Sequence, residues 1–381
     1  MFLAHVLVAI SACAVVSSAD NCHSPLESPP PSRELFAFWT GTERWPDFNF
    51  TTLTTIGAFA DVSEELLCMA HENNVRVVLA SGMCPSLTNP EGEACPADVN
   101  STEAVEIWSD YLVNRTNAEG LDGVNLDIEG GILPEHRDDL TAAVMTLRRK
   151  MLERNPLSQL SMDSFCLPTD PTRSKFYDWV ELTDIVDFIF AMCYDMPFMV
   201  QNIYSEFYET AWEFSEAPLV QAAFPMLRRG IDQHIELSIN ITSKVVLGLP
   251  WYGYEFDCTQ PHGLQCIMYE DWVNQKPRPS REIDLKDILD ISRGGGDVTD
   301  EGEDEENAAK FLEYNVEGLR HEIWYDDAET LARKYKLAED FNMKGVGWWT
   351  VDAIYHDDPA DDDVENIQAM WDALEVFSLV K

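Results

Sequence analysis

The sequence predicts an α/β fold, a parallel eight-stranded (β/α)8 TIM barrel with a long irregular insertion between the seventh and eighth strands. Apolar runs of strand length recur eight times along the chain, and helix-like patterns lie between them. These runs are almost continuously apolar, which is typical of parallel strands that are covered on both faces. They comprise residues 35–39, 55–60, 76–81, 123–129, 160–166, 185–194, 245–251 and 345–351.

Three of the intervening segments carry clear signals for a helix. Ser63 precedes residues 64–70, so its hydroxyl can cap a helix that has acidic residues in its first turn. Pro134 suits the start of a second helix, which we expect to end at the cations of residues 148–150. Residues 364–374 have the apolar spacing of an amphipathic terminal helix.

The predicted organisation is one barrel domain behind a processed N-terminus. Residues 1–19 are interpreted as a secretory signal peptide, because an apolar run there precedes small residues. Residues 20–33 form a Pro-rich leader, and residues 34–381 form a single domain whose insertion spans about residues 254–321. No later run approaches the roughly 18 apolar residues that a membrane-spanning helix needs.

An acidic run at residues 297–306 of the insertion is interpreted as a solvated, disordered loop. A calcium-binding loop would need ligands at alternating positions around a central glycine and a closing glutamate. Gly302 gives only a loose match to that pattern. We therefore expect no metal site and no other cofactor.

Acidic residues outnumber basic residues by 68 to 26, which gives a formal net charge of −42. This excess repels nucleic acid and anionic membrane surfaces, so neither is expected as a partner. An acidic compartment would protonate part of the excess, so a lysosome-like location fits the composition. Secretion into a salt-rich exterior, where charges are screened, fits as well. We expect a monomer.

Eight of the nine cysteines remain once residues 1–19 are removed, and an even number in a secreted chain indicates disulfides. Cys166 and Cys193 lie in predicted strands, so free thiols are an alternative to a disulfide for these two residues. The spacing of the others leaves their connectivity open, with three pairs favoured: Cys84 with Cys95, Cys258 with Cys266, and Cys22 with Cys68. Four sequons on the same secretory route are open to glycosylation: Asn49, Asn100, Asn114 and Asn240.

The predicted strand at residues 123–129 carries the strongest functional signal. Its side chains alternate, so that one face is apolar and the other presents Asn125, Asp127 and Glu129. A buried charge is costly unless it is paired, and a carboxyl beside a second carboxylate keeps its proton to higher pH. This pattern suits a general acid. The alternative is a strand that reaches the surface and simply exposes its acids to water.

Further polar and aromatic side chains end other predicted strands, where the active sites of TIM barrels lie. Tyr194 and Asp195 follow the sixth strand, Trp251 and Tyr252 follow the seventh, and Trp349 ends the eighth. Glycines at positions 345 and 347 would leave a hollow beneath the indole of Trp349. An aromatic floor with convergent polar groups suits a glycan, although each aromatic side chain could equally belong to the barrel core.

The order Asp-Gly-x-Asn-x-Asp-x-Glu at residues 122–129 resembles the Asp-Gly-x-Asp-x-Asp-x-Glu signature of family 18 glycoside hydrolases. It departs from the signature at Asn125 and at Ile128, and both departures resemble the di-N-acetylchitobiase branch of that family. Met-x-Tyr-Asp at residues 192–195 and the strand-eight Trp349 resemble other motifs of the family. The resemblance extends from about Phe36 to Trp371.

The resemblance implies substrate-assisted catalysis with retention of configuration, which needs no carboxylate nucleophile from the protein. Glu129 would protonate the glycosidic oxygen and later activate water. Asp127 would orient the 2-acetamido group of the sugar and offset the positive charge that develops, and Tyr194 would hydrogen-bond the acetamido oxygen. Asp195 would brace Glu129 or a sugar hydroxyl. Asn125 cannot share a proton as an aspartate would, so a changed pH optimum is expected.

The resemblance also implies an N-acetylglucosamine-containing oligosaccharide as substrate, bound by Asn125, Asp195, Trp349, Trp251 and Tyr252. The predicted activity is hydrolysis of the β-1,4 bond of the N,N'-diacetylchitobiose core at the reducing end of free oligosaccharides. A secreted endo-chitinase and a non-catalytic glycan-binding lectin are the alternatives, and the lectin is less favoured because Glu129 is present. The sequence has no His-Glu-x-x-His, Gly-x-Ser-x-Gly, phosphate-loop or dinucleotide motif.

Overall fold

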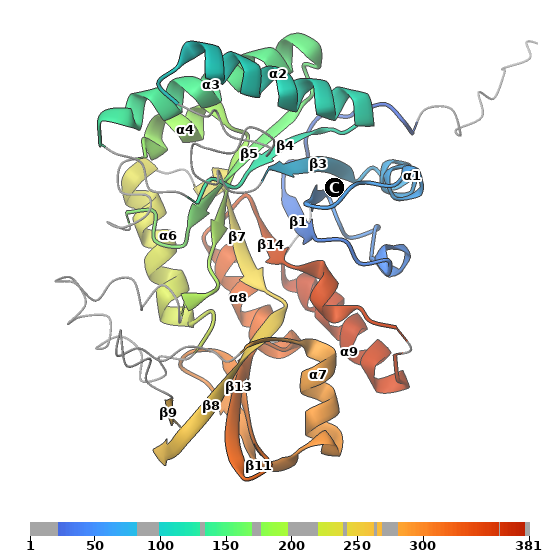
Figure 1. The fold of residues 1–381 in the computed structure, drawn as a ribbon, viewed down its shortest axis with the longest axis vertical. Helices are drawn as coiled ribbons and strands as arrows, with labels where there is room; N and C mark the ends of the chain where they lie inside the picture. Colours follow the sequence, from blue (N-terminus) through green and yellow to red (C-terminus); the bar gives the residue numbers. More distant parts are fainter. Residues whose placement is uncertain are drawn as a thin grey trace, which may run out of the picture.

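The computed structural model describes residues 22–81, 99–129, 134–169, 177–196, 220–238, 242–262, 265–268, 281–357 and 359–377. Eight strands close into a barrel in the order β1-β14-β7-β6-β5-β4-β3-β2, and every neighbouring pair is parallel (Figure 1). The predicted TIM barrel is therefore confirmed. Its strands are β1 (Glu34–Trp39), β2 (Thr55–Ala58), β3 (Arg76–Ser81), β4 (Gly123–Leu126), β5 (Gln159–Phe165), β6 (Phe188–Met192), β7 (Val245–Pro250) and β14 (Gly345–Trp349).

The predicted strand boundaries differ most from the observed ones at the end of β4 and at the start of β6. The strand expected to reach Glu129 ends as β4 at Leu126, so both catalytic candidates lie just beyond it. The strand expected from Ile185 begins as β6 only at Phe188, because Ile185 is the last residue of helix α4 (Trp179–Ile185). Only Val186 and Asp187 separate α4 from β6, and hydropathy alone could not place that boundary.

Phenylalanine rings fill the barrel interior around β1 and β6. Phe36 packs edge-on against Phe38 at 4.9 Å and against Phe188 at 5.8 Å, measured between ring centroids. Phe190 lies 4.9 Å from Phe38. A Cβ atom at Gly347 would lie only 2.6 Å from the Phe190 ring. The hollow that we expected this glycine to leave is thus filled by an aromatic ring.

Helices cover the outside of the barrel, and α2 and α3 lie side by side over one flank (Figure 1). The Ser63 hydroxyl accepts a hydrogen bond from the Leu66 amide and caps α1, as predicted. Helix α3 continues past the expected end at residues 148–150 to Arg154, and the Arg148 guanidinium pairs with Asp187. The helices are α1 (Glu64–Glu72), α2 (Thr102–Glu119), α3 (Arg137–Arg154), α4, α6 (Phe224–Ser238), α8 (Ala328–Asp340) and α9 (Asp361–Asp372).

The insertion between β7 and β14 lies where the sequence placed it, but its described part is a sheet instead of an irregular segment (Figure 1). Its antiparallel strands run in the order β10-β8-β13-β12-β11, and β9 pairs with β8. A second small core lies beneath this sheet. The elements are β8 (Tyr252–His262), β9 (Gln265–Met268), β10 (Arg281–Asp284), α7 (Leu285–Asp290), β11 (Asp297–Asp304), β12 (Ala309–Val316) and β13 (Leu319–Tyr325).

The acidic run at residues 297–306 is not a disordered loop, and that prediction is wrong. Most of it forms β11, which pairs with β12 along one side and ends the sheet on the other. Val298 packs against the small core, while Asp300 and Glu301 are exposed. Charged side chains protect an edge strand from pairing with other chains, so acidity and strand formation are compatible here.

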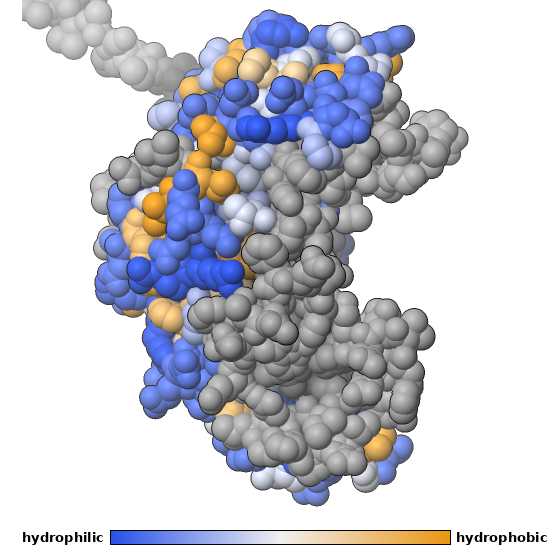
Figure 2. Space-filling model, turned by 90° about the vertical axis from the view of Figure 1, so that its left-hand side faces the viewer, coloured by the Kyte–Doolittle hydropathy of each residue, from blue (hydrophilic) through white to orange (hydrophobic). Residues whose placement is uncertain are grey.

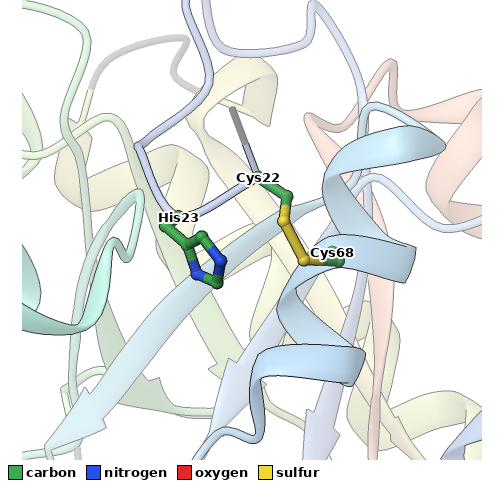
Figure 3. A group of neighbouring side chains, drawn as sticks. All are labelled: Cys22, His23 and Cys68. Carbon is green, nitrogen blue, oxygen red and sulfur yellow. A yellow bond between two sulfur atoms is a disulfide. The ribbon is translucent and has the colours of Figure 1, made fainter. Parts of the chain in front are cut away.

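The leader is joined to the barrel by a disulfide between Cys22 and Cys68, as expected (Figure 3). Cys258 is also disulfide-bonded. The pair proposed between Cys84 and Cys95 lies outside the described residues, as do the signal peptide at residues 1–19 and the sequon at Asn240.

Cys166 and Cys193 form a disulfide, which excludes the alternative that they are free thiols. β5 and β6 are neighbours, and Phe165 lies opposite Met192 in their register. The next residue of each strand is a cysteine, and the two sulfur atoms therefore meet at the carboxyl end of the barrel. The sequence did not reveal this because it does not show which strands pair in which register.

Within the described residues, no helix has both the length and the apolarity needed to cross a bilayer. The described part of one face is mostly hydrophilic, in keeping with the acidic composition (Figure 2).

Candidate active site

A pocket of about 200 Å³, open to solvent on one side, lies at the carboxyl ends of the barrel strands. Both acids of the strand-four motif line the pocket. The described residues that line it are Phe38, Asp127, Glu129, Asp163, Phe165, Met192, Tyr194, Asp195, Glu282 and Trp349.

Asp127 and Glu129 follow β4 and lie close enough to influence each other electrostatically. Asp127 is buried, whereas Glu129 is partly exposed to the pocket. Burial, and secondarily the charge of Glu129, raises the pKa of Asp127 to about 7. The pair therefore keeps a proton at mildly acidic pH, which is the condition that a general acid requires. The Tyr177 hydroxyl donates to the Ile128 carbonyl at 3.2 Å and supports the backbone between the two acids.

Asn125 lies beneath the pocket, fully buried, and does not line it. Its amide nitrogen donates hydrogen bonds to Asp163 Oδ1 at 2.7 Å and to Ser161 Oγ at 3.0 Å. The predicted contact of Asn125 with substrate is thus replaced by contacts to the neighbouring strand β5.

Asp163 is a pocket residue that our sequence analysis missed. Its side chain is only 2% exposed. Burial, followed by the charge of Asp127, raises its pKa well above the usual value, although the Asn125 hydrogen bond acts in the opposite direction. An available signal was the alternation of Ser161, Asp163 and Phe165 along an otherwise apolar strand, which places an acid in the barrel interior.

Tyr194 and Asp195 follow β6 and line the pocket, as predicted from their positions at a strand end. Burial, and then the charges of Asp163 and Asp127, raises the pKa of Tyr194 well above the usual value, so its hydroxyl stays a neutral donor. Asp195 accepts hydrogen bonds from the hydroxyls of Tyr252 and Tyr254. Tyr252 is therefore brought to the site through Asp195 and is not itself among the described lining residues.

Trp349 is half-buried and lines the pocket. Its ring packs edge-on against Phe38 and Phe59, at centroid distances of 5.5 and 5.4 Å. These contacts hold the indole in place while part of it remains exposed to a ligand.

Trp251 is not in the pocket, and its prediction as a substrate contact is wrong. Its side chain is 1% exposed and packs against Trp348 and Trp371 at centroid distances of 4.5 and 5.1 Å. Its indole N–H donates to the Tyr335 hydroxyl at 3.1 Å. Trp371 belongs to α9, so Trp251 lies in the layer between barrel and helices.

Glu282 reaches the pocket from β10 of the insertion and was also missed. Glu282 lies opposite Tyr254 in the pairing of β10 with β8. Burial and then the charge of Asp195 raise its pKa. No local pattern in the sequence marks this residue, because its position depends on how the insertion folds back over the barrel.

Two groups of side chains in the described residues have spacings that a metal ion could use. In the first, Cys22, His23 and Cys68 lie together, but the two sulfur atoms are bonded to each other and offer no thiolate (Figure 3). In the second, Glu255 is grouped with Asp257 and His321. The Glu255 carboxylate is already neutralised by Arg281 and accepts a hydrogen bond from the Tyr314 hydroxyl at 2.6 Å.

Comparison with known proteins identifies relatives along most of the chain. Residues 97–353 match the family described as Glycosyl hydrolases family 18. The chain is 25% identical to di-N-acetylchitobiase of Homo sapiens over 355 residues, which cover 90% of this chain and 84% of the human protein. It is 26% identical to probable di-N-acetylchitobiase 1 of Dictyostelium discoideum over 379 residues, which cover 95% and 92% of the two chains.

Two solved structures show the same fold. The chitinase of Chromobacterium violaceum superposes with a TM-score of 0.65 at 16% identity, covering 92% of this chain and 99% of that protein. A family 18 chitinase mutant of Cycas revoluta, crystallised with (GlcNAc)4, superposes with a TM-score of 0.66 at 14% identity, covering 89% and 99%.

Proposed function

Because the chain belongs to family 18 of the glycosyl hydrolases, we propose that it hydrolyses the β-1,4 bond of N,N'-diacetylchitobiose at the reducing end of free oligosaccharides. The observation that carries this proposal is the pocket in which Asp127, Glu129 and Tyr194 meet beside the indole of Trp349. The relatives named di-N-acetylchitobiase, which match about nine-tenths of the chain, support this substrate over long chitin chains.

Glu129 is the general acid in this proposal, because its carboxyl is partly exposed where a glycosidic oxygen would lie. It donates its proton to the leaving oxygen while the 2-acetamido oxygen of the sugar attacks the anomeric carbon. The bond between the sugars breaks, and a cyclic oxazolinium ion forms without a protein nucleophile. Glu129 then takes a proton from water, which opens the ring with net retention of configuration.

Asp127 and Tyr194 stabilise the acetamido group during these steps. Asp127 accepts a hydrogen bond from the acetamido N–H and offsets the positive charge of the oxazolinium ion. The Tyr194 hydroxyl donates to the acetamido oxygen and directs it toward the anomeric carbon. A preorganised set of this kind is effective because the pocket is partly shielded from water.

Trp349 and Asp195 bind the sugar. An indole offers an apolar face to the sugar ring, and Asp195, held by two tyrosine hydroxyls, offers a carboxylate in a fixed position. The acidic composition supports a location in an acidic compartment of the secretory route, such as the lysosome. In this proposal the protein acts as a monomer.

Chitotriose labelled at its reducing end tests the proposed function. We expect the wild type to release labelled N-acetylglucosamine, and Glu129→Gln to lose at least about 10²-fold in kcat because the proton donor is removed. Glu135→Gln, an exposed acid nearby in the chain, serves as the matched control and should retain full activity. Faster internal cleavage of longer chitin oligomers would reveal an endo-chitinase instead, and an active Glu129→Gln enzyme would overturn the mechanism.

A further inference from the structure

Asp163 occupies a position that the family signature does not specify. Asn125 stands where the signature has an aspartate, and it lies opposite Ser161 in the pairing of β4 with β5. The Asn125 amide reaches across this pair and donates to Asp163 Oδ1 at 2.7 Å. A buried carboxyl that the motif lacks on β4 is therefore present on β5, two residues beyond Ser161, and is held in place by the substituted residue.

The surroundings of Asp163 are acidic or neutral. Asp127 and Glu129 face it from the end of β4, and the neutral Tyr194 hydroxyl faces it from the end of β6, while Asp195 lines the same pocket. Within the described residues, no lysine, arginine or histidine is among the charges that shift the pKa of Asp127 or Asp163. Carboxylates this close and this buried cannot all be ionised, so a proton must remain among them.

One buried oxygen shows where that proton is needed. Asp127 Oδ1 has no hydrogen-bond partner among the described residues. Leaving a buried acceptor unsatisfied is costly, and two ionised carboxylates cannot satisfy each other. A protonated Asp163, whose carboxyl interacts electrostatically with Asp127, would supply that proton, while its other oxygen continues to accept from the Asn125 amide.

We propose that Asp163 is a positioning residue that shares a proton with Asp127, taking the place of the aspartate that the family signature has at Asn125. This inference rests on the proposed function and deepens it. The shared proton keeps the Asp127 carboxyl turned toward the acetamido group, and Asp163 itself does not touch the reacting atoms. The proton-sharing carboxyl thus lies on β5 instead of β4, and the Asn125 amide holds it in place by a hydrogen bond.

Asp163→Asn tests this inference, because the amide has the same shape but cannot share the proton. We expect kcat on labelled chitotriose to fall by up to about 100-fold, since Asp127 loses its orientation. The alkaline limb of the pH profile should move to lower pH. In the wild type, loss of the shared proton places a second negative charge near Glu129, which keeps its proton to higher pH, and the variant lacks that second charge. The double variant Asn125→Asp/Asp163→Asn returns the carboxyl to β4. We expect it to recover most of the activity and to return the alkaline limb of the pH profile to its wild-type position.

Asp187→Asn is the matched control. Asp187 accepts a hydrogen bond from the Leu160 amide at 2.7 Å and pairs with Arg148, so it anchors the opposite end of β5. Its loss can lower stability but should not move the pH profile. If Asp163→Asn keeps the wild-type profile, or if the double variant is no better than the single one, the inference is wrong.

Infrared difference spectra separate this inference from the proposed function. At about pH 6 an ordinary aspartate is ionised, so the difference between wild type and Asp163→Asn should contain the carbonyl band of a protonated carboxylic acid. A folded wild type that shows this band but does not cleave chitotriose would overturn the proposed function alone. A wild type that cleaves chitotriose without this band would overturn the role of Asp163.

Discussion

Tyr194 is the residue whose contribution to the proposed reaction depends on a single atom. Its ring is buried against the barrel, and its hydroxyl remains a neutral donor because burial and the nearby Asp163 raise its pKa. Removing this hydroxyl by Tyr194→Phe leaves the packing of the ring intact. We expect kcat to fall by about 10²–10³-fold, the usual cost of losing one donor to a developing charge, with little change in melting temperature.

Steady-state kinetics on chitotriose measure this effect, with Tyr355→Phe as the matched control. The Tyr355 hydroxyl donates to the Asp47 carbonyl at 3.0 Å, at a site whose residues do not line the pocket, so its loss should not alter kcat. A Tyr194→Phe enzyme with wild-type kcat would show that the acetamido oxygen is positioned without the hydroxyl.

At this same scale, alternation along the chain explains which of the predicted site residues reach the pocket and which do not. Asp127 and Glu129 alternate with apolar neighbours, and the structure places both on the pocket. Asp163 shows the same alternation and could have been predicted by applying the rule to the next strand. Trp251 was misplaced because it follows the last residue of β7, where the two-residue period no longer holds.

At the scale of elements, local patterns predicted the barrel strands but not the pairings that depend on three-dimensional register. Hydropathy located all the strands of the barrel because each is buried on both faces. The acidic β11 was taken for a loop because its strand character comes from pairing with β12 and not from its own residues. Glu282 could not be predicted for the same reason, since it enters the pocket from the folded insertion.

The disulfide between Cys166 and Cys193 ties together the strand ends that carry Asp163 and Tyr194. Replacing both cysteines with alanine should lower the free energy of unfolding by about 2–4 kcal/mol through the greater freedom of the unfolded chain. We also expect kcat to fall, because β5 and β6 can then move apart at the pocket. Urea unfolding and kinetics on chitotriose measure the two effects.

Removing the disulfide between Cys22 and Cys68 provides the comparison. It spans 46 residues against 27 for the first, so its loss should cost at least as much stability. It joins the leader to α1 away from the pocket, and kcat should therefore stay unchanged. Equal losses of kcat in the variants that lack either disulfide would show that overall stability controls activity, and not the link between β5 and β6.

At the scale of the whole molecule, the net charge of −42 and several buried acids should both make the fold more stable at acidic pH. The surface contribution is self-repulsion, which weakens as carboxylates are protonated and is screened by salt. The buried contribution comes from individual groups whose protons the folded state retains. The sequence states the total charge, but only the structure shows which acids are buried.

Glu34 is the clearest of these buried acids. It lies at the start of β1 with no exposed surface, and its Oε2 atom accepts hydrogen bonds from the hydroxyls of Thr54 and Thr55 at 2.7 and 2.9 Å. Burial raises its pKa to about 7 against this partial compensation. Between about pH 4.5 and 7 the folded state therefore holds a proton that the unfolded state releases.

The free energy of unfolding should accordingly fall as the pH rises through this window, by about 3 kcal/mol from Glu34 alone. Asp127 acts in the same direction, whereas His234, whose pKa is lowered to about 4 by burial, acts in the opposite direction at the acidic end. Urea unfolding between pH 5 and 8 in high salt isolates the buried groups, because salt screens the surface charge. Glu34→Gln, which cannot ionise, should flatten the decline, and an unchanged slope in that variant would show that Glu34 does not retain its proton in the folded state.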